Sequence, residues 1–494
     1  MSKDKHEDWE RFGRATKPSA AEITEFNAQR NKPKTFDAAS YYGQMLIHRA
    51  HVTMLAEEGI ISHSEAKTLL NGLMKVDKQA KSDPSLVSYM STETALIKEV
   101  GEVGGRMHIG RSRNDLGHAQ KRLYYRDQVE LVIGHVIEFQ KKLTETAERN
   151  IDTVMPGYTH WRQAQPTTLA HYLLAHAEAA FRTVDRLEDC YKRTNLSPLG
   201  SAAFAGTGWP VNRRRTAELL GFNDLILNSQ DCVASIDYCI EFAAALAIHM
   251  SNLSRLAEDI QIWSSDEFML LDLDEAYAGT SSIMPQKKNP LILEYVKAYA
   301  AESLGAMVST AASMKGVSYT NTVDRVMLEP VTIDTAIGST RIMGGVVETM
   351  NPLRENMAKR LSEGFATTTD LADALVRVHT IGFRQAHDIL VEVTLRCLRE
   401  GKRAEEINGD MIREAAIMVV GKPLDLSESE IKEATNPTLN VKRRNVSGGP
   451  SPRSVREMIR VQKRLIIGAK KRQSKRLDKI KNAVRKLKEA EIAL

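Results

Sequence analysis

The sequence predicts an all-α protein built from long helices packed side by side, and two observations support that prediction. Aromatic residues make up 6% of the chain and only 15 of its 494 residues are proline. This composition suits helices packed by aliphatic side chains better than a sheet rich in aromatic and β-branched residues. Apolar residues also recur at heptad-like spacing over long stretches, a pattern that aligns helices nearly parallel in a bundle.

Four long helices are expected in order along the chain. The first lies around residues 129–143 and the second around 236–260, because apolar residues there alternate at spacings of three and four. The third is expected over 165–193 and the fourth over 291–312. The first two repeats are formed by Val129, Val132, Val136, Phe139 and Leu143, and by Ile236, Cys239, Ala243, Leu246, Met250, Leu253, Ala257 and Ile260.

Loops rich in glycine and small polar residues separate these helices, over 101–110, 198–209 and 277–290. Loops on a rigid helical scaffold are where binding and catalytic groups usually lie, so these three are candidate sites of chemistry. Three domains are expected: an N-terminal helical domain over 1–110, the long-helix domain over 111–360, and a C-terminal helical domain with a basic tail over 361–494.

The basic tail has two interpretations. Residues 453–494 hold 15 Lys and Arg against four Asp and Glu, in a chain whose net charge is +5. A surplus of this size is compatible with nucleic-acid binding. Packing against other helices is favoured instead, because no aromatic residue interleaves the charges and an apolar stripe runs along the tail. The stripe consists of Leu477, Ile480, Val484 and Leu487.

The start of the chain and its cysteines indicate a cytoplasmic protein. Residues 1–17 are charged and polar, unlike an export signal, and no later segment approaches a membrane span. No metal or cofactor is implied, since there is no Cys or His cluster with ligand spacing and no dinucleotide-binding glycine pattern. Four scattered cysteines are expected to be buried free thiols: Cys190, Cys232, Cys239 and Cys397.

The loop over 279–290 is the most informative stretch for chemistry. It reads Gly-Thr-Ser-Ser-Ile-Met-Pro-Gln-Lys-Lys-Asn-Pro and places hydroxyls, backbone N–H groups and cations in front of a helix. Such groups suit an anion or a developing carbanion. A phosphate loop is disfavoured, because the Walker spacing is missing and no strand is expected before the loop.

Three blocks, in order, resemble the argininosuccinate lyase branch of the fumarase/aspartase superfamily. They are Gly-Arg-Ser-Arg-Asn-Asp at 110–115, Met-Pro-Gly-Tyr-Thr-His at 155–160 with Ala-Gln-Pro at 164–166, and Met-Pro-Gln-Lys-Lys-Asn-Pro at 284–290. The resemblance implies three helical domains, a homotetramer whose central helices form a common core, and active sites shared between subunits. It also implies a carbon–nitrogen lyase that reversibly releases fumarate from an N-substituted aspartate, a small-molecule substrate.

The resemblance also assigns catalytic roles. It makes Ser281 the base that removes the proton beside the distal carboxylate, giving an aci-carboxylate that Lys287 stabilises. It pairs His160 with Glu294. The residues it implies for substrate binding are Ser112, Arg113, Asn114, Thr159, Gln165, Ser282, Met284, Asn289 and Tyr319. Arg325, from a segment that departs from the family pattern, is a further candidate for substrate binding. The histidines that lie in helical patterns are expected to be structural: His118, His135 and His249.

The region expected to hold the leaving amine departs from the argininosuccinate lyase pattern. That branch places Asp-x-His where this chain has Val-Ser-Tyr at 87–89, and a run with glutamine and lysine where this chain reads Thr-Asn-Thr-Val-Asp-Arg-Val-Met at 320–327. Leu-Gly-His at 116–118 also replaces a Gln-Val continuation. A cation at Arg325 would favour an amine that carries a carboxylate. In this respect the chain resembles enzymes that split ethylenediamine-N,N′-disuccinate (EDDS), an aminopolycarboxylic acid.

Several alternatives stay open. The first is argininosuccinate lyase itself, which gives arginine and fumarate. The second is adenylosuccinate lyase of the same superfamily, which the loop and the Ser-Arg-Asn block fit less well. The third is a catalytically silent structural relative, like the inactive lens δ-crystallins. The intact serine, lysine, asparagine and histidine of the three blocks argue against a silent protein.

Overall fold

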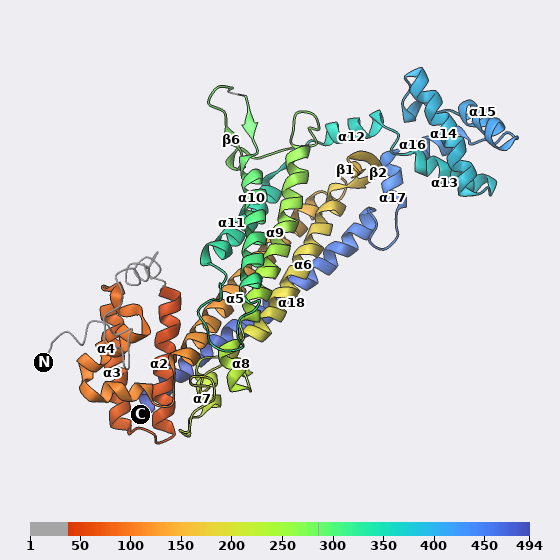
Figure 1. The fold of residues 1–494 in the computed structure, drawn as a ribbon. Helices are drawn as coiled ribbons and strands as arrows, with labels where there is room; N and C mark the ends of the chain where they lie inside the picture. The colour runs from red at the N-terminus through yellow and green to blue at the C-terminus, as the bar shows by residue number, and fades with distance from the viewer. Residues whose placement is uncertain (1–37, 285) are drawn as a thin grey trace.

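The described part of the chain is an elongated molecule with a central rod of helices and a smaller helical group at each end (Figure 1). The structure is a computed structural model that describes residues 38–284 and 286–494. The polar start of the chain at 1–17, on which the cytoplasmic prediction rests, lies outside the described residues.

The central rod is a bundle of long helices, as predicted. Every residue of the two heptad repeats is buried in one hydrophobic cluster. The long helices expected around 129–143 and 236–260 are confirmed, and the one expected over 291–312 matches within a residue. The bundle consists of α5 (Arg113–Arg149), α6 (Leu169–Thr194), α9 (Asp237–Trp263), α10 (Leu291–Ser313), α11 (Pro330–Thr349) and α18 (Pro452–Ala493).

The third predicted helix begins four residues later than expected. Residues 165–168 belong instead to strand β2 (Arg162–Thr168), which pairs antiparallel with β1 (Val154–Thr159). Pro166 explains the difference, because proline lacks an N–H donor and holds the preceding residue extended. Thr168 then caps α6 by accepting a hydrogen bond from the backbone N–H of His171.

Short strands make the all-α prediction only partly right. Among the described residues these strands form further two-stranded pairs. β3 (Leu196–Ser197) pairs parallel with β4 (Asp224–Leu225). Two pairs are antiparallel: β5 (Leu271–Asp272) with β8 (Asn351–Pro352), and β6 (Gly279–Thr280) with β7 (Lys288–Asn289). The last pair turns the predicted loop over 277–290 into a hairpin, preceded by the short helix η4 (Glu275–Tyr277). The loop predicted over 101–110 contains the 3-10 helix η3 (Gly101–His108).

The first helical group packs around its own cluster of aliphatic side chains. It consists of α2 (Ala38–Glu57), α3 (His63–Ala80), η2 (Pro84–Val87) and α4 (Tyr89–Val100) with η3. The short helices α7 (Arg213–Leu219) and α8 (Ser229–Ala234) lie at the same end of the bundle (Figure 1).

The second group lies at the opposite end (Figure 1) and has a separate cluster between residues 371 and 434. It consists of α13 (Thr368–His379), α14 (Phe383–Glu400), η5 (Ala404–Glu406), α15 (Gly409–Val420) and α16 (Glu428–Thr435), with α12 (Arg354–Glu363) and α17 (Pro437–Arg443) joining it to the bundle.

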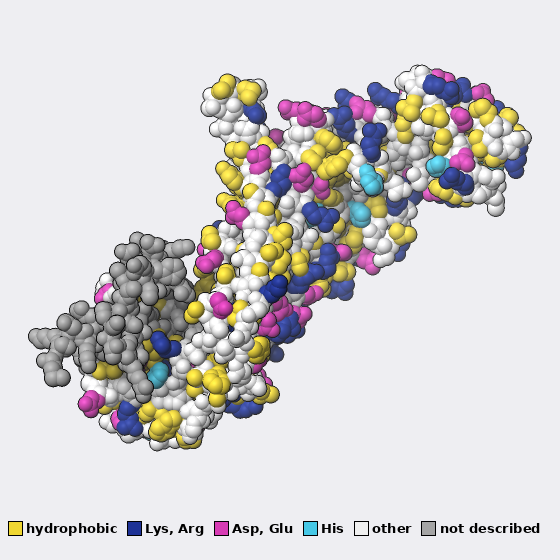
Figure 2. All heavy atoms as spheres, in the orientation of Figure 1, with side chains coloured by type: hydrophobic (Ala, Val, Ile, Leu, Met, Phe, Trp, Pro, Cys, Tyr) yellow, Lys and Arg dark blue, Asp and Glu magenta, His cyan; other side chains and the backbone are white. Residues whose placement is uncertain are grey.

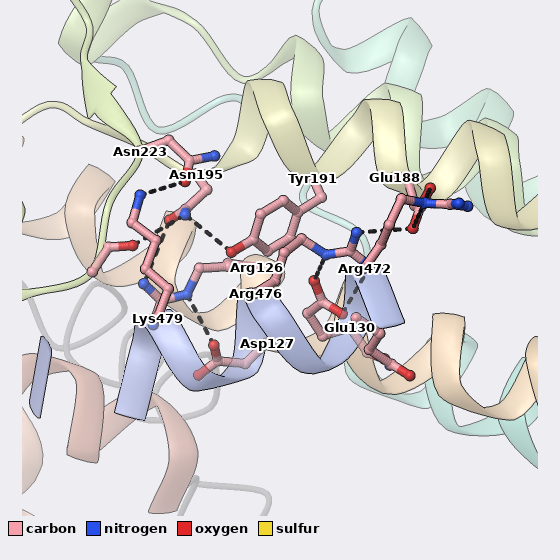
Figure 3. A network of polar contacts seen from close by, with 12 residues as sticks. Arg126, Asp127, Glu130, Glu188, Tyr191, Asn195, Asn223, Arg472, Arg476 and Lys479 are labelled. Atoms are coloured by element: carbon pink, nitrogen blue, oxygen red, sulfur yellow. Dashed lines mark hydrogen bonds and ion pairs between the residues drawn. The ribbon is translucent and has the colours of Figure 1, made fainter. Parts of the chain in front are cut away.

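Helix α18 carries the basic tail back along the whole bundle. Leu487 is fully buried beside residues of α2, α5 and α7, and Val484 packs against the same cluster. Many of the tail's cations pair within the chain: Figure 3 shows Arg476 between Glu130 and Glu188. The expected packing of the tail is therefore confirmed, although Leu477 remains 37% exposed.

All four cysteines are free and buried, as expected. Within residues 38–284 and 286–494, every helix is too short or too polar to cross a bilayer.

Candidate active site

The first predicted block forms the N-terminal end of α5. Ser112 is the N-cap, and its hydroxyl oxygen accepts a hydrogen bond from the backbone N–H of Asn114 at 3.2 Å. Asp115 completes a capping box by accepting from the N–H of Ser112 at 3.0 Å. Arg113 occupies the first helical position and is exposed. These contacts leave the Arg113 guanidinium open to solvent at the positive end of the helix dipole, which suits a carboxylate.

Asp115 connects this block to the loop at 198–209. Its carboxylate is fully buried, and it accepts hydrogen bonds from the N–H groups of Gly200 at 3.1 Å and Ala202 at 3.0 Å. Burial raises the pKa of Asp115, while these backbone donors and Arg111 oppose the rise. Asp115 was not among the predicted functional residues. The S-x-x-D spacing at Ser112 is the signal that could have revealed it.

The segment expected to hold the leaving amine lies against the same block. The side-chain amide of Asn321 donates to the Oδ1 of Asn114 at 2.8 Å. Arg325 donates to the Oδ1 of Asn321 at 3.1 Å and to the carbonyl of Ala234, the last residue of α8, at 2.7 Å. The Arg325 guanidinium therefore fixes this segment onto α8, and its predicted contact with substrate stays a prediction. Tyr319 is 65% exposed and donates to Asp231.

The second segment that departs from the argininosuccinate lyase pattern also packs near this end of α5. Tyr89 contacts His108 through its hydroxyl, and its ring lies 5.8 Å from the guanidinium carbon of Arg111. Burial raises the pKa of Tyr89, so this phenol stays protonated. The two divergent segments and the Ser112 block therefore share one end of the bundle.

The second block forms the hairpin of β1 and β2, at the other end of α5. His160 and Trp161 form its tip with φ of 52° and 59°, a left-handed conformation that favours glycine or asparagine. Strain of this kind recurs where a side chain must be presented for function. Thr159 and Gln165 lie exposed in the two strands, and His160 borders a cavity of about 220 Å³ with Tyr172 and Trp263.

The third block forms the hairpin of β6 and β7. The hydroxyl oxygen of Ser281 accepts hydrogen bonds from the backbone N–H groups of Met284 at 3.0 Å and Ile283 at 3.3 Å. Ser282 and Lys287 are exposed, and Asn289 pairs with Gly279 across the hairpin. Lys288 is held by both carboxylate oxygens of Asp272 at 2.9 Å.

The predicted pair of His160 and Glu294 does not form within one chain. Glu294 lies in the first turn of α10, where its carboxylate accepts a hydrogen bond from Gln261 at 3.3 Å. His160 lies at the tip of the β1–β2 hairpin. The pairing of these two residues therefore stays a prediction.

The Ser112 block lies far from the other two blocks. Asn114 contacts Asn321, which Arg325 holds against α8, just before the start of α9. Trp263, the last residue of α9, borders the His160 cavity at the opposite end of that helix. Lys288 ties the Ser281 hairpin to β5, just beyond that same end of α9. Helix α9 has 27 residues and is therefore about 40 Å long. One chain cannot bring Ser112 and Ser281 to the same small substrate.

No group of three or more His, Cys, Asp or Glu residues that could hold a metal ion occurs in the part of the chain that the structure describes.

Two family models match the chain. The one described as Lyase matches residues 13–305, and the one described as Argininosuccinate lyase C-terminal matches residues 365–442. Together with the long-helix bundle and its three polar blocks, these matches define a lyase of the fumarase/aspartase fold.

Individual relatives narrow that class. The argininosuccinate lyase of Methanococcoides burtonii is 42% identical over 459 residues, 91% of each chain. The crystal structure of EDDS lyase in complex with formate has a TM-score of 0.90 at 42% identity and covers 97% of both chains. An EDDS lyase variant with bound fumarate matches equally well, over 98% of both chains. The chain belongs to the argininosuccinate lyase family and is a carbon–nitrogen lyase that eliminates fumarate.

Proposed function

We propose that this lyase acts on an N-succinyl amine whose leaving amine carries further carboxylates, with EDDS as the favoured example. Overall sequence identity does not distinguish between the two candidate substrates, because the argininosuccinate lyase and the EDDS lyase are both 42% identical to the chain. The choice rests on the residues around Asn114. There the chain has Asn321 and Arg325 in place of the glutamine and lysine pattern of argininosuccinate lyases.

The geometry of Ser281 is the observation that carries the proposed chemistry. A serine hydroxyl is a poor base unless its conjugate alkoxide is stabilised. Two backbone N–H groups already point at the Ser281 oxygen, and they would stabilise a negative charge on that atom. Ser281 takes the proton from the carbon beside the distal carboxylate. The electron pair moves into that carboxylate, and it then forms the double bond of fumarate as the C–N bond breaks.

The doubled charge on the aci-carboxylate must be stabilised during this reaction. Lys287 is exposed and shows no ion pair among the described residues, so its ammonium group is available for this role. Asn289 lies two residues further along the same hairpin. Arg113 and Ser112 would bind the succinyl carboxylates from the N-terminal end of α5. His160 or a group bound to it returns a proton to the departing amine.

A complete site requires other copies of the chain, and we propose a homotetramer. The supporting observation is the distance along α9 between the Ser112 and Ser281 blocks. Figure 2 shows apolar side chains along the central bundle, and several of them lie on α10. A monomer rarely exposes so long an apolar stripe. Its residues on α10 are Leu291, Tyr295, Tyr299, Leu304 and Val308.

Fumarate absorbance with two substrates tests the proposal. Argininosuccinate and EDDS are offered in parallel, with Ser281→Ala as the control variant. We expect fumarate from EDDS and none from the variant. Efficient turnover of argininosuccinate with no turnover of EDDS would make this an arginine-forming enzyme. No fumarate from either substrate would favour a silent structural relative.

A further inference from the structure

One face of α5 continues from the Ser112 block into a group of basic side chains. Asn114, His118 and Lys121 follow one another at spacings of four and three, so they lie on one face of the helix. His118 is 1% exposed, and neither of its ring nitrogens has a hydrogen-bond partner that meets normal geometry. The amide of Asn321 lies close enough to affect the ring without meeting that geometry. His118 was expected to be structural, yet its polar atoms are unused.

Three cations lie near this histidine: Lys121, Arg325 and Arg122. Burial lowers the pKa of His118 to about 3, and Lys121 and then Arg325 add to the effect. Burial also lowers the pKa of Lys121, with Arg325 as the second cause. Lys121 shows no ion pair or hydrogen bond to another described residue. The buried hydroxyl of Thr322 lies close enough to the Asp324 carboxylate to lower the pKa of that carboxyl, without meeting normal hydrogen-bond geometry. We call His118, Lys121, Asn321, Thr322 and Arg325 the α5 basic cluster.

An unpaired cation in a partly buried position such as that of Lys121 is costly, and so is a buried donor without an acceptor. The α5 basic cluster contains several donors but no carboxylate of its own that reaches Lys121 or His118. A carboxylate bound there would satisfy both the ammonium group of Lys121 and the imidazole of His118. Four residues of helix span about 6 Å and seven span about 10 Å. The cluster thus lies one to two helical turns beyond Asn114, in line with the rest of an extended substrate.

We propose that His118 and Lys121 form a subsite that binds a carboxylate of the leaving amine, while Arg325 positions Asn321 and Thr322 beside it. This inference rests on the proposed fumarate elimination. It deepens that proposal, because it names the substrate class as N-succinyl amines with an anionic amine half. The Ser112 block binds the succinyl half, and the next turns of α5 bind the other half.

A matched pair of substrates isolates this subsite. N-(2-carboxyethyl)aspartate and N-propylaspartate have amine halves of equal length that end in a carboxylate and a methyl group, and EDDS serves as a third substrate. We expect wild-type kcat/KM to favour the carboxylate. Lys121→Met should reduce that preference about tenfold, the effect of losing one charged contact. The reduction should appear in KM, and KM for EDDS should rise in parallel.

Control variants separate binding from folding. Lys121→Arg keeps the charge and should retain most of the preference. Lys141→Met removes an exposed lysine further along α5 and should leave all three substrates unchanged. Equal loss with both short substrates in Lys121→Met would indicate a structural role and overturn the subsite. An unchanged preference in Lys121→Met would also overturn the subsite. If neither short substrate reacts, an unchanged KM for EDDS in Lys121→Met would overturn it.

These outcomes are distinct from failure of the proposed function. If wild-type protein releases fumarate from N-propylaspartate as fast as from the carboxylate substrate, the elimination stands and the subsite is wrong. If wild-type protein releases no fumarate from these three substrates or from argininosuccinate, the proposed function fails, and the subsite fails with it.

Discussion

At the scale of single residues, Asp115 orders the Ser112 block, although it was not among the predicted site residues. Its two carboxylate oxygens accept four backbone N–H groups, from Ser112, Leu116, Gly200 and Ala202. One side chain thus fixes both the start of α5 and the neighbouring loop. The carbonyl of Ala203 in that loop accepts from Asn114. The orientation of the Asn114 side chain, and with it the proposed contact to substrate, therefore depends on Asp115.

Asp115→Asn tests this dependence. The substitution keeps the shape but places an NH₂ group against two N–H donors, leaving buried groups unpaired. We expect the free energy of unfolding to fall by about 2 kcal/mol, and kcat/KM for fumarate release to fall about a hundredfold through misplacement of Asn114. Thermal unfolding and steady-state kinetics measure the two effects. Asp127→Asn, at a carboxylate that is 56% exposed, should change neither quantity much.

At the scale of single elements, the sequence predicted the helices well and the hairpins poorly. Long heptad repeats identify α5 and α9, because their burial follows directly from periodicity. The last four residues of β2, 165–168, were predicted to start a helix, because the polar residues of this hairpin carry no clear alternation. Its shape depends on Pro166 and on a close backbone approach at Gly157. A Cβ at Gly157 would lie 2.6 Å from the carbonyl oxygen of Gln165.

Gly157→Ala should therefore distort the hairpin that presents His160. We expect kcat/KM to fall by about a hundredfold, the size of effect that a shift of about 1 Å produces. The far helices should stay intact, so helical circular dichroism should hardly change. Gly338→Ala is the matched control, since a Cβ there meets nothing within 4 Å. Normal activity in Gly157→Ala would mean that the hairpin tolerates the shift.

Helix α18 depends on charge pairs that composition could not reveal. Arg476 contacts Glu130 and Glu188, which are 3% and 11% exposed, and its guanidinium carbon lies 5.2 Å from the ring centre of Tyr191 (Figure 3). Arg472 adds a second contact to Glu188 at 2.8 Å. The basic surplus of the tail therefore serves internal pairing at the middle of the bundle, where two acidic side chains are buried.

Arg476→Met should lower the free energy of unfolding by about 3 kcal/mol, because it leaves a buried carboxylate unpaired. Replacing Glu130 by glutamine in the same chain should recover part of the loss. Lys463→Met removes an exposed pair with Glu148 and should cost less than about 1 kcal/mol. Thermal unfolding of all four proteins makes the comparison. Equal losses for Arg476 and Lys463 would show that burial of the pair does not matter.

At the scale of the whole molecule, buried histidines link stability to pH. Burial is the main cause that lowers the pKa of each. The pKa falls to about 3 in His51 and His118, to about 4 in His176 and His249, and well below its ordinary value in His48. Unfolding restores the ordinary pKa of 6.5, so the unfolded chain binds more protons between pH 6.5 and about 4.

Stability should thus be highest above pH 6.5 and fall as the pH drops toward 4. Each histidine contributes a slope of about 1.4 kcal/mol per pH unit within that window. His249→Gln keeps a donor for Thr340 and should flatten the dependence of the thermal midpoint on pH. His387→Gln, at a side chain that is 52% exposed, should leave it as it was. An unchanged slope in His249→Gln would contradict this account.

The sequence could predict the three polar blocks but not their arrangement in space. The three blocks are local patterns, and each one folds as a local unit: a helix cap and two hairpins. Their separation along α9 depends on tertiary packing, which no local pattern records. The domain boundaries at 110 and 360 stay a prediction for a similar reason. Helix α18 was assigned to the C-terminal domain, yet it packs along α5 and α6.

The separation of the blocks leads to a test that depends on assembly alone. Asn114→Ala and Ser281→Ala damage opposite ends of the bundle, so the proposed homotetramer of either variant should be inactive. If every site takes its Asn114 from one copy and its Ser281 from another, mixed tetramers contain some undamaged sites. Random assortment of equal amounts leaves about a quarter of the sites intact. Unfolding and refolding the two variants together should therefore restore about a quarter of wild-type fumarate release, whereas each variant refolded alone should restore none. A mixture that stays inactive, although light scattering shows assembled tetramers, would mean that each chain completes its own site and that the separation along α9 has been misjudged.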